Sequence, residues 1–504
     1  MRTNSRLFRL RPLSALCRGQ RRSPLSFSSR KSLWALALPA LLAGCALGPD
    51  YKRPEMVVPT EYRWQDQSAT GSEFGDLQWW EVYRDPQLWA ILKVALQENL
   101  DVRIAAARVE QARAALGSSR LQFLPTISGE AGVTRQRTSE YARLLPDQPA
   151  IGESDTAAVN ASYELDIWGR LRRLNEASRA QFLGSQYAQQ GVMVGLIADV
   201  ATTYFNLITL DEQLAITRNT METRQKFVDL THAKHKGGVI SGLDVSTAES
   251  ELATARANVP EIERQAALAE DRLSILLGKN PGDIVRSGVT ARAELSLPQP
   301  PTGLPSSLLE RRPDIRRAEQ DLVAANAQVG AAKAALFPTI SLTGSLGSRS
   351  NELSNLFKGP ARTWTAGAGL ALPLIDAQNN LYQLDLADAR KREVLLTYQQ
   401  AVQNAFREVA DALIARQKYV EFLAAQQDKV DALRRADNIA MARYKVGYSS
   451  YFDVINSNRD LFNAELALSS AQLNALLANV QLYQALGGGW AAGKTASTAD
   501  GVGQ

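Results

Sequence analysis

The chain has 504 residues, of which 45% are apolar and 22% charged, a composition that excludes both a disordered chain and a bundle of membrane helices. The formal net charge of +5 suggests a nucleic-acid-binding protein, but residues 1–44 contain nine Lys or Arg and no Asp or Glu. The remainder carries 48 basic and 52 acidic side chains, so we expect no nucleic-acid partner.

Residues 1–44 are predicted to be a cleaved signal peptide. A basic stretch is followed by an apolar run at 33–42 and by Leu42-Ala43-Gly44-Cys45, which resembles a bacterial lipobox. Cys45 is then expected to carry a covalent lipid and to begin the mature chain. The Arg- and Ser-rich leader also fits a mitochondrial transit peptide, although such peptides do not end on this tetrapeptide. No stretch of 18 or more apolar residues occurs, so we expect no membrane-spanning helix.

The rest of the chain is an internal duplication with a period of about 209 residues. Residues 124–128 recur as 337–341, and residues 236–245 recur as 445–454. The predicted organisation is an N-terminal lipid-anchored segment at 45–85, a first repeat at 86–296, a Pro-rich linker at 297–310, a second repeat at 311–487 and a tail at 488–504.

Each repeat is predicted to run helix, strand, strand, long helix, helix. In the first repeat the helix covers 86–122, the strands about 124–136 and 157–168, the long helix 169–236 and the returning helix 243–277. In the second repeat the corresponding ranges are 313–336, about 338–348 and 362–374, 377–446 and 452–486.

The four strands have the length of tilted strands that cross a bilayer, about 10–12 residues. Alternation of apolar and polar residues is more often the mark of an ordinary half-buried strand. Four such runs in an exported lipoprotein favour the membrane. Because lipid forbids open sheet edges, we expect an oligomer: two chains give eight strands and a filled barrel, and three give twelve and a lumen. The predicted lipid-facing positions are Ile127, Val133, Val159, Tyr163, Leu165, Ile340, Leu342, Trp364, Leu370 and Leu372.

The long helices are predicted to extend for about 100 Å at 1.5 Å per residue. The helices at 86–122 and 243–277 are each about half as long, so two of them stacked end to end match one long helix. The returning helices carry an apolar stripe rich in alanine, which permits close helix packing. Pro260 lies inside the first stripe and is expected to kink that helix, whereas the second repeat has Ser469 there.

Candidate sites for chemistry are few. Residues 488–495 match the phosphate-binding loop pattern, but a helix precedes them and no magnesium-binding strand follows, so we expect no nucleotide site. His232 and His235 are the only histidines, and without thiols or a clear third ligand a solvated helix end is favoured over a metal site. We expect neither an enzyme nor a cofactor.

Short motifs occur in order along nearly all of the mature chain. They are GPDYKRP at 48–54, WW at 79–80, DPQL at 85–88, AAARVEQARA at 105–114, FLP at 123–125, YELDIWGR at 163–170, RRPDI at 311–315, RYKVG at 443–447 and LYQALGGGW at 482–490. Each motif is weak alone, but their order is specific. Together with the duplication, the chain resembles the outer-membrane efflux protein (TolC-like) family, in its lipid-anchored branch.

This resemblance implies a mainly α fold with transmembrane β: a homotrimer whose twelve-stranded barrel in the outer membrane continues as a long α-helical coiled-coil barrel across the periplasm. It implies a passive exit duct of a tripartite efflux pump for drugs or other small toxic solutes. The implied partners are a periplasmic adaptor protein, an inner-membrane transporter and outer-membrane lipid. The competing interpretation of the residues is a lipid-anchored periplasmic coiled-coil scaffold without a pore.

The resemblance also implies a gate at the periplasmic tip. Asp453 matches an entrance aspartate, Tyr444 a bonding tyrosine and Asp244 its acidic partner, while Ser449 and Asn456 replace the family's arginine and second aspartate. We therefore expect a closed resting state held chiefly by Tyr444 and Asp244. Three copies of Asp453 near one axis favour a bound cation or a raised pKa. The alternative is that both aspartates cap the N-termini of the returning helices, a role that is compatible with the gate.

Overall fold

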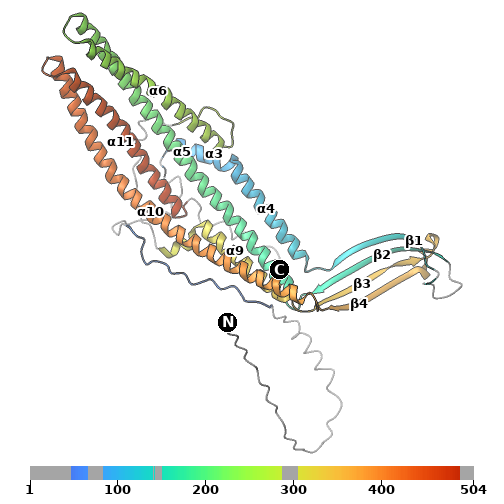
Figure 1. Ribbon diagram of the computed structural model, residues 1–504. Coiled ribbons are helices and arrows are strands. Elements are labelled where there is room, and N and C mark those ends of the chain that lie inside the picture. Colours follow the sequence, from blue (N-terminus) through green and yellow to red (C-terminus); the bar gives the residue numbers. More distant parts are fainter. Residues whose placement is uncertain are drawn as a thin grey trace, which may run out of the picture. The chain divides into compact units, whose positions relative to one another are not determined.

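A computed structural model of the chain describes residues 47–65, 83, 85–139, 141, 150–286 and 305–488 (Figure 1). The predicted signal peptide, Cys45, most of the predicted linker and the tail beyond Gly488 lie outside the described residues.

The element order confirms the duplicated plan. In the first repeat the structure has α3 (Pro86–Glu98), α4 (Leu100–Leu121), β1 (Thr126–Arg137), β2 (Ile151–Leu165), α5 (Arg170–Lys236) and α6 (Gly242–Leu276). In the second it has α8 (Leu308–Arg311), α9 (Pro313–Ala334), β3 (Thr339–Ser350), β4 (Arg362–Ala371), α10 (Ala377–Lys445) and α11 (Tyr451–Ala485). The predicted long and returning helices all lie within two residues of their observed bounds.

Two predicted elements were wrong in their extent. The helix expected at 86–122 is broken at Asn99, whose side chain accepts hydrogen bonds from the backbone nitrogens of Asp101 (2.8 Å) and Val102 (3.1 Å) and so caps α4. Strand β2 begins at Ile151 rather than at 157, because its pairing with β1 continues outward past the apolar alternation. Glu153 and Asp155 occupy apolar-face positions there, which hid the strand's beginning in the sequence.

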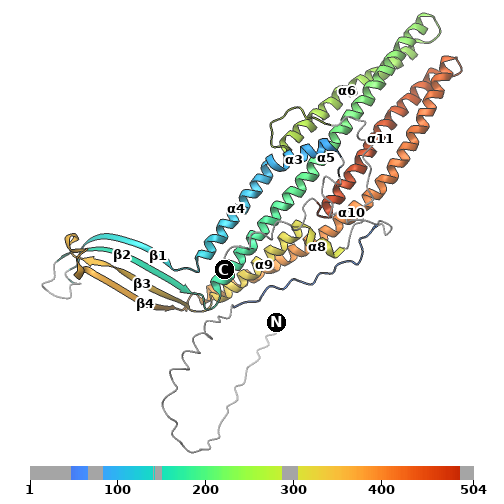
Figure 2. The ribbon, with the colours of Figure 1, turned by 180° about the vertical axis from the view of Figure 1, so that it is seen from behind.

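The helices form a layer that is four helices wide at both levels. Toward the sheet the neighbours run α4, α5, α9, α10, and toward the tips they run α6, α5, α11, α10 (Figures 1 and 2). Helices α5 and α10 continue through both levels, while α4 and α6, and likewise α9 and α11, share one position in the layer. The outer helices of the layer are therefore α4 with α6 on one side and α10 on the other.

End-to-end stacking of the shorter helices is confirmed in both repeats. The Asn99 side-chain amide donates to the Leu276 carbonyl at the end of α6 (3.0 Å), and Arg312 donates to the Ala485 carbonyl at the end of α11 (3.0 Å). Gly278 and Gly487 end these helices at φ +68° and +74°, where only glycine is unstrained. Helix α6 is continuous through Pro260.

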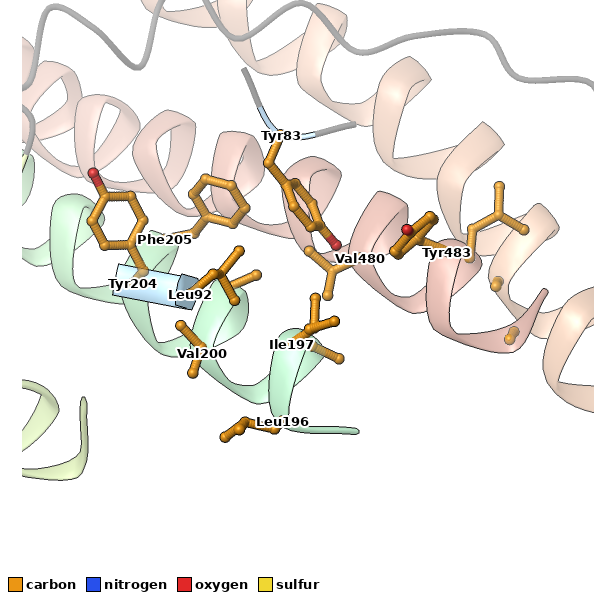
Figure 3. Close-up of a cluster of buried hydrophobic side chains, with 14 of the residues drawn as sticks. Tyr83, Leu92, Leu196, Ile197, Val200, Tyr204, Phe205, Val480 and Tyr483 are labelled. Carbon is orange, nitrogen blue, oxygen red and sulfur yellow. The ribbon is translucent and has the colours of Figure 1, made fainter. Parts of the chain in front are cut away.

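The main hydrophobic core lies where α3, α5, α10 and α11 meet. Figure 3 shows Tyr83 between Phe205 and Tyr483, with ring centroids 6.1 and 6.0 Å away. The Tyr204 hydroxyl donates to Asp85 (2.8 Å), the cap of α3, so the core also fixes the start of that helix. Contrary to the expectation of no membrane-spanning helix, one stretch of α5 is apolar enough to cross a membrane by length and composition, but 61% of it is buried within the chain.

The strands form one antiparallel sheet in the order β1-β2-β3-β4. Strand β1 follows α4 and strand β4 leads into α10, so each edge strand joins an outer helix of the layer. Helix α5 begins five residues after β2 and ends at a helical tip, which places the sheet and the tips at opposite ends of the long helices (Figure 1).

Candidate functional site: the two-faced sheet and the helical tips

One face of the sheet is apolar. The register pairs Val159 with Leu346 and Leu346 with Trp364, and directly paired residues point to the same side of an antiparallel sheet. By the same register, every predicted lipid-facing position within the strands lies on this apolar face; Leu372 lies one residue beyond β4. Trp364 and Ile127 are 76% and 71% exposed, which is typical of a surface that meets lipid or a partner.

The opposite face is polar and carries small residues. Glu130 on β1 accepts a hydrogen bond from the Asn160 amide on β2 (3.2 Å), and Ser341 and Thr343 on β3 neighbour Gly369 and Gly367 on β4. The two faces thus differ in the way expected of a barrel wall with lipid on one side and water on the other.

Both edges of the sheet are open within the described strands. Strand β1 pairs only with β2, and β4 pairs only with β3, so each edge presents a row of unsatisfied backbone groups. A sheet with open edges and an apolar face cannot lie in lipid alone. The chain is therefore one segment of a wall that further strands must close.

An N-terminal strap, defined here as residues 47–53, holds the junction between sheet and helices. The Leu47 backbone nitrogen donates to the Trp168 carbonyl (3.0 Å), and the Trp168 indole donates to the Pro338 carbonyl (2.8 Å) while its ring lies 4.9 Å from that of Phe337. Arg173, which is buried on α5, binds Asp50 (2.8 Å). The first residues after the predicted lipid site are thus fixed beside the base of the strands.

The far end of the strap binds α9. Arg53 donates to both carboxylate oxygens of Glu319, a buried residue of α9, at 2.7 and 2.5 Å, and it also pairs with Glu310. The Tyr51 hydroxyl donates to the same Glu319 (3.3 Å), and burial raises the pKa of Tyr51. Opposite charges therefore fasten this extended segment along the helices.

At the tips, both returning helices begin with a capping box. In α6 the Ser241 hydroxyl accepts from the Asp244 backbone nitrogen (3.3 Å), and Asp244 accepts from the Ser241 nitrogen (3.0 Å). Ser450 and Asp453 repeat this arrangement in α11 at 3.3 and 3.1 Å. The capping interpretation of both aspartates is confirmed.

Ser449 and Asn456, which stand where the resemblance implies an arginine and a second aspartate, both form hydrogen bonds within the chain. The Ser449 hydroxyl donates to Asp453 (2.9 Å), and Asn456 accepts from Arg459 (3.0 Å). The Ser450 hydroxyl, the Ser449 hydroxyl and the Ser450 backbone lower the pKa of Asp453. These donors belong to the same chain, so the raised pKa expected for three copies near one axis stays a prediction.

The predicted Tyr444–Asp244 hydrogen bond is not formed within the chain. The Tyr444 hydroxyl is buried and has no hydrogen-bond partner among the described residues, while Asp244 is engaged in its own cap. The Tyr444 ring instead lies against Phe227 (5.5 Å) and below the Lys234 ammonium (3.9 Å). Tyr444 packs between the hairpins rather than bonding across them, because α5 brings an aromatic ring to its face.

Sequence reasoning missed the groups that join the two hairpins near the tip. Phe227 of α5 stacks on Tyr451 of α11 (5.0 Å, 16° between planes), and the buried Arg224 donates to Asn458 of α11 (3.2 Å). A cavity of about 30 Å³ lies beside Arg224 and Phe227. The available signal was a comparison of the two repeats, since the equivalent positions carry no aromatic residue.

The metal and nucleotide sites that the sequence argued against gain no support from the described residues either. His232 pairs with Glu249 of α6 (3.0 Å) and His235 Nδ1 lies 3.0 Å from the Ile240 carbonyl, so both lie at an ordinary helix end. Within the described residues, no group of three or more His, Cys, Asp or Glu is placed to hold a metal ion. The segment 488–495, which matches the phosphate-binding loop pattern, lies almost wholly outside the described residues.

Comparisons with known proteins agree with this geometry. Residues 91–279 and 304–488 match the model of the outer membrane efflux protein family. The chain is 37% identical over 469 residues to the solvent efflux pump outer membrane protein SrpC of Pseudomonas putida, covering 91% of this chain and 98% of that protein. It is 32% identical to the cation efflux system protein CusC of Escherichia coli (89% and 96% covered). The open state of the Neisseria gonorrhoeae MtrE outer membrane channel matches with a TM-score of 0.80 at 32% identity, covering 88% of this chain and 98% of that one.

Proposed function

The chain belongs to the outer membrane efflux protein family and is an outer-membrane channel that extends into the periplasm, and on this premise we propose that three copies form the exit duct of a tripartite efflux pump. In this proposal the four strands of each copy combine into a twelve-stranded barrel. The four-helix layers combine into the wall of a tube that continues from the barrel.

The open edges of sheet and helix layer support the number three. Strands β1 and β4 are unpaired on the same sides as the outer helices α4 and α10, so neighbouring copies close both layers at once. Two copies give eight strands, whose interior side chains fill, and three give twelve strands with room for a lumen. A duct requires the larger barrel.

The gate and the partner surface are assigned to the tips. Both tips expose apolar side chains beside basic ones, which suits a helical hairpin of a periplasmic adaptor protein; the exposed apolar residues are Val239, Leu243, Val446, Tyr448 and Phe452. An inner-membrane transporter then supplies the energy, since the duct itself is passive. Asp453 supplies a negative charge at the entrance.

The cargo is proposed to be drugs or other small toxic solutes. SrpC is named for solvent efflux and CusC for cation efflux, so one architecture serves chemically different loads. A wide aqueous tube selects little, and the transporter then sets the specificity. A lipid on Cys45 adds a second attachment to the same membrane.

The observation that carries the proposal is the sheet with one apolar face and two open edges. Purified protein compared boiled and unboiled on a denaturing gel, with single-channel recordings in planar bilayers, tests it. We expect a heat-labile trimer that conducts ions. A monomer without conductance contradicts the duct and favours the lipid-anchored scaffold.

A further inference from the structure

A hollow of about 310 Å³ lies in one face of the helix layer, where α4, α5 and α9 run side by side. Its apolar floor is built from Ala105 of α4 with Ala188 and Val192 of α5. Helix α4 bounds the hollow on one side and α9 on the other, so all of its walls belong to one chain. A neighbouring copy that joins at the outer edge of the layer therefore leaves the hollow open.

The rim of the hollow carries a net positive charge. Arg108 of α4 and Arg317 of α9 supply two cations, and Asp321 of α9 supplies one carboxylate, which lies 3.9 Å from Arg317. Arg108 is exposed and has no hydrogen-bond or ion-pair partner among the described residues. The unpaired group at the rim is thus a guanidinium, whose fork of donors matches a carboxylate.

The N-terminal strap marks the outer side of the helix layer, because it continues from Cys45, whose proposed lipid lies in the membrane around the barrel. The strap binds α9 through the Glu319 carboxylate and through Asn326, whose amide donates to the strap backbone (2.8 Å). Asp321 follows Glu319 by two residues, which is about 200° around a helix of 3.6 residues per turn. The rim of the hollow therefore faces away from the strap.

The sheet gives the same orientation independently of the lipid. Glu164 lies on the polar face of the sheet, and Arg170 at the start of α5 donates to its carboxylate at 2.8 and 3.1 Å. Ala188 lies about five turns beyond Arg170, so both residues lie along one line of α5. The polar side of the strands therefore continues into the helix face that holds the hollow, and this side lines the lumen of the proposed duct.

The size and chemistry of the hollow define the kind of molecule that fits it. An apolar cavity of about 150 Å³ holds a benzene molecule, so the larger hollow has room for an aromatic ring with its substituent. The ring covers the alanine floor, and an acidic group on the ring reaches the Arg108 guanidinium. Because the hollow is open to water on one side, this ion pair is screened and the binding is expected to be weak.

We propose that the hollow is a binding site for small aromatic carboxylates on the lumen wall, with one site in each copy. This assignment rests on the proposed duct and names one class of its cargo. Weak binding at the wall holds such anions briefly and releases them again, so it raises their concentration in the tube without closing it.

Fluorine NMR of para-fluorobenzoate with the detergent-solubilised protein measures the binding, because exchange with a large complex broadens the signal of the probe. Para-fluorobenzamide has the same ring without the charge, and empty micelles are the blank. We expect saturable broadening of the carboxylate and little broadening of the amide. Equal broadening of both probes, or none above the blank, overturns the proposal.

Two variants assign the binding to the hollow. Arg108→Gln removes the unpaired cation and is expected to weaken binding about fivefold, and Ala188→Leu fills the floor and is expected to weaken it as well. Arg113→Gln is the matched control, since Arg113 lies five residues farther along α4 and covers the Phe182 ring instead (5.7 Å). Unchanged affinity in the first two variants, or an equal loss in Arg113→Gln, places the probe elsewhere and contradicts the site.

A cysteine at the hollow tests whether it faces the lumen. Ser185→Cys lies at the hollow, whereas Arg179→Cys lies six residues earlier and about 240° around α5. In planar bilayers we expect a charged thiol reagent to change the current of Ser185→Cys alone, and para-fluorobenzoate to slow that reaction. Wild-type protein with the same reagent is the control, and mass spectrometry verifies that both cysteines are modified.

A change of current with Arg179→Cys alone, or with neither modified cysteine, places the hollow outside the lumen and overturns the proposal. A protein that forms no trimer or never conducts contradicts the duct itself. A conducting trimer that does not bind para-fluorobenzoate contradicts only the site.

Discussion

At the residue scale, Tyr444 matches the family motif at the tip, but the hydrogen bond to Asp244 that the motif implies is not formed within the chain. The caps that Asp244 and Asp453 form are predictable from the sequence, because a Ser three residues before an Asp at a helix start predicts a capping box from local geometry alone. The environment of Tyr444 is not predictable in this way, because it depends on Phe227 and Lys234, which are more than 200 residues away. Local hydrogen bonds are predictable from spacing, whereas packing across hairpins is not.

Replacing Tyr444 by Phe is expected to leave both conductance and trimer stability unchanged to within about 1 kcal/mol. The hydroxyl is buried without a partner among the described residues, so its removal leaves no hydrogen bond broken. Tyr444→Ala removes the packed ring instead and is expected to cost about 3–5 kcal/mol and to loosen the tip. Single-channel recording and the temperature of trimer dissociation measure both effects. Increased conductance for Tyr444→Phe alone reveals a partner in the neighbouring copy.

Asp453→Asn is expected to weaken cation selectivity and divalent block. Hydroxyl and backbone donors lower the pKa of Asp453 below its usual 3.8, so the carboxylate stays charged above about pH 4. The stabilisation from its cap is present above the unfolded pKa and is lost as the pH falls through the lower folded value. Reversal potentials in a salt gradient measure the selectivity, which we expect to be constant between pH 5 and 8.

Asp244→Asn is the matched control, since Asp244 holds the equivalent cap in the first hairpin. Equal loss of selectivity in both variants places the entrance charge on both tips. No change in either variant leaves Asp453 with its capping role alone.

At the scale of elements, the junctions between stacked helices set the shape of each repeat. The stacking followed from helix lengths, but the break at Asn99 was missed because the apolar pattern continues across it. Asn99 followed by Asp101 was the available signal, since Asn is a favoured cap and acidic residues favour a first turn. Gly278 then packs its backbone directly against that break.

Gly278→Ala is expected to destabilise the protein by about 1–3 kcal/mol from the positive φ alone. The added Cβ also meets the Glu98 carbonyl oxygen at 2.3 Å, so α6 must move away from the α3–α4 break. Gly117→Ala is the control because no atom lies within 4 Å of its added Cβ, and in a helix interior it is expected to stabilise by about 0.5–1 kcal/mol. Thermal unfolding followed by circular dichroism compares them; equal midpoints contradict the close approach.

Leu342→Arg is expected to weaken the trimer, by roughly 2–4 kcal/mol if the position lies at the membrane midplane and by less toward either interface. Leu342 pairs with Tyr163 and Ala368 on the apolar face, whereas the adjacent Ser341 pairs with Glu164 and Gly369 on the polar face. Ser341→Arg is therefore expected to cost little. The temperature at which each trimer dissociates on a gel measures the difference, and equal values contradict the assigned faces.

At the scale of the whole molecule, the sequence predicted an assembly of several chains, because one chain cannot close its own sheet. Apolar–polar alternation predicted the strands. The match in length between two short helices and one long helix predicted the layer, and the open sheet edges predicted further copies. The outer end of β2 depends instead on its continued pairing with β1, and the packing between the hairpins depends on which side chains meet across the duplication. Phe227 looks like any helical apolar residue until Tyr451 is placed opposite it.

The assembled molecule is attached to its membrane by the barrel and, in the proposal, by a lipid on Cys45. A Cys45→Ser form directed to the periplasm by another signal is expected to retain the trimer and part of the efflux activity. The apolar faces of the combined sheets anchor the assembled barrel, and the strap is held by Arg173 and Arg53 without help from a lipid. The lipid then raises the yield of assembled protein rather than the transport rate of each channel.

The amount of heat-labile trimer and the rate of dye efflux per trimer measure these two quantities separately. Cys17→Ser, which changes only the predicted signal peptide, is the control and is expected to match wild type. A normal amount of trimer with no efflux gives the lipid a role in transport, and complete loss of trimer makes it a requirement for insertion.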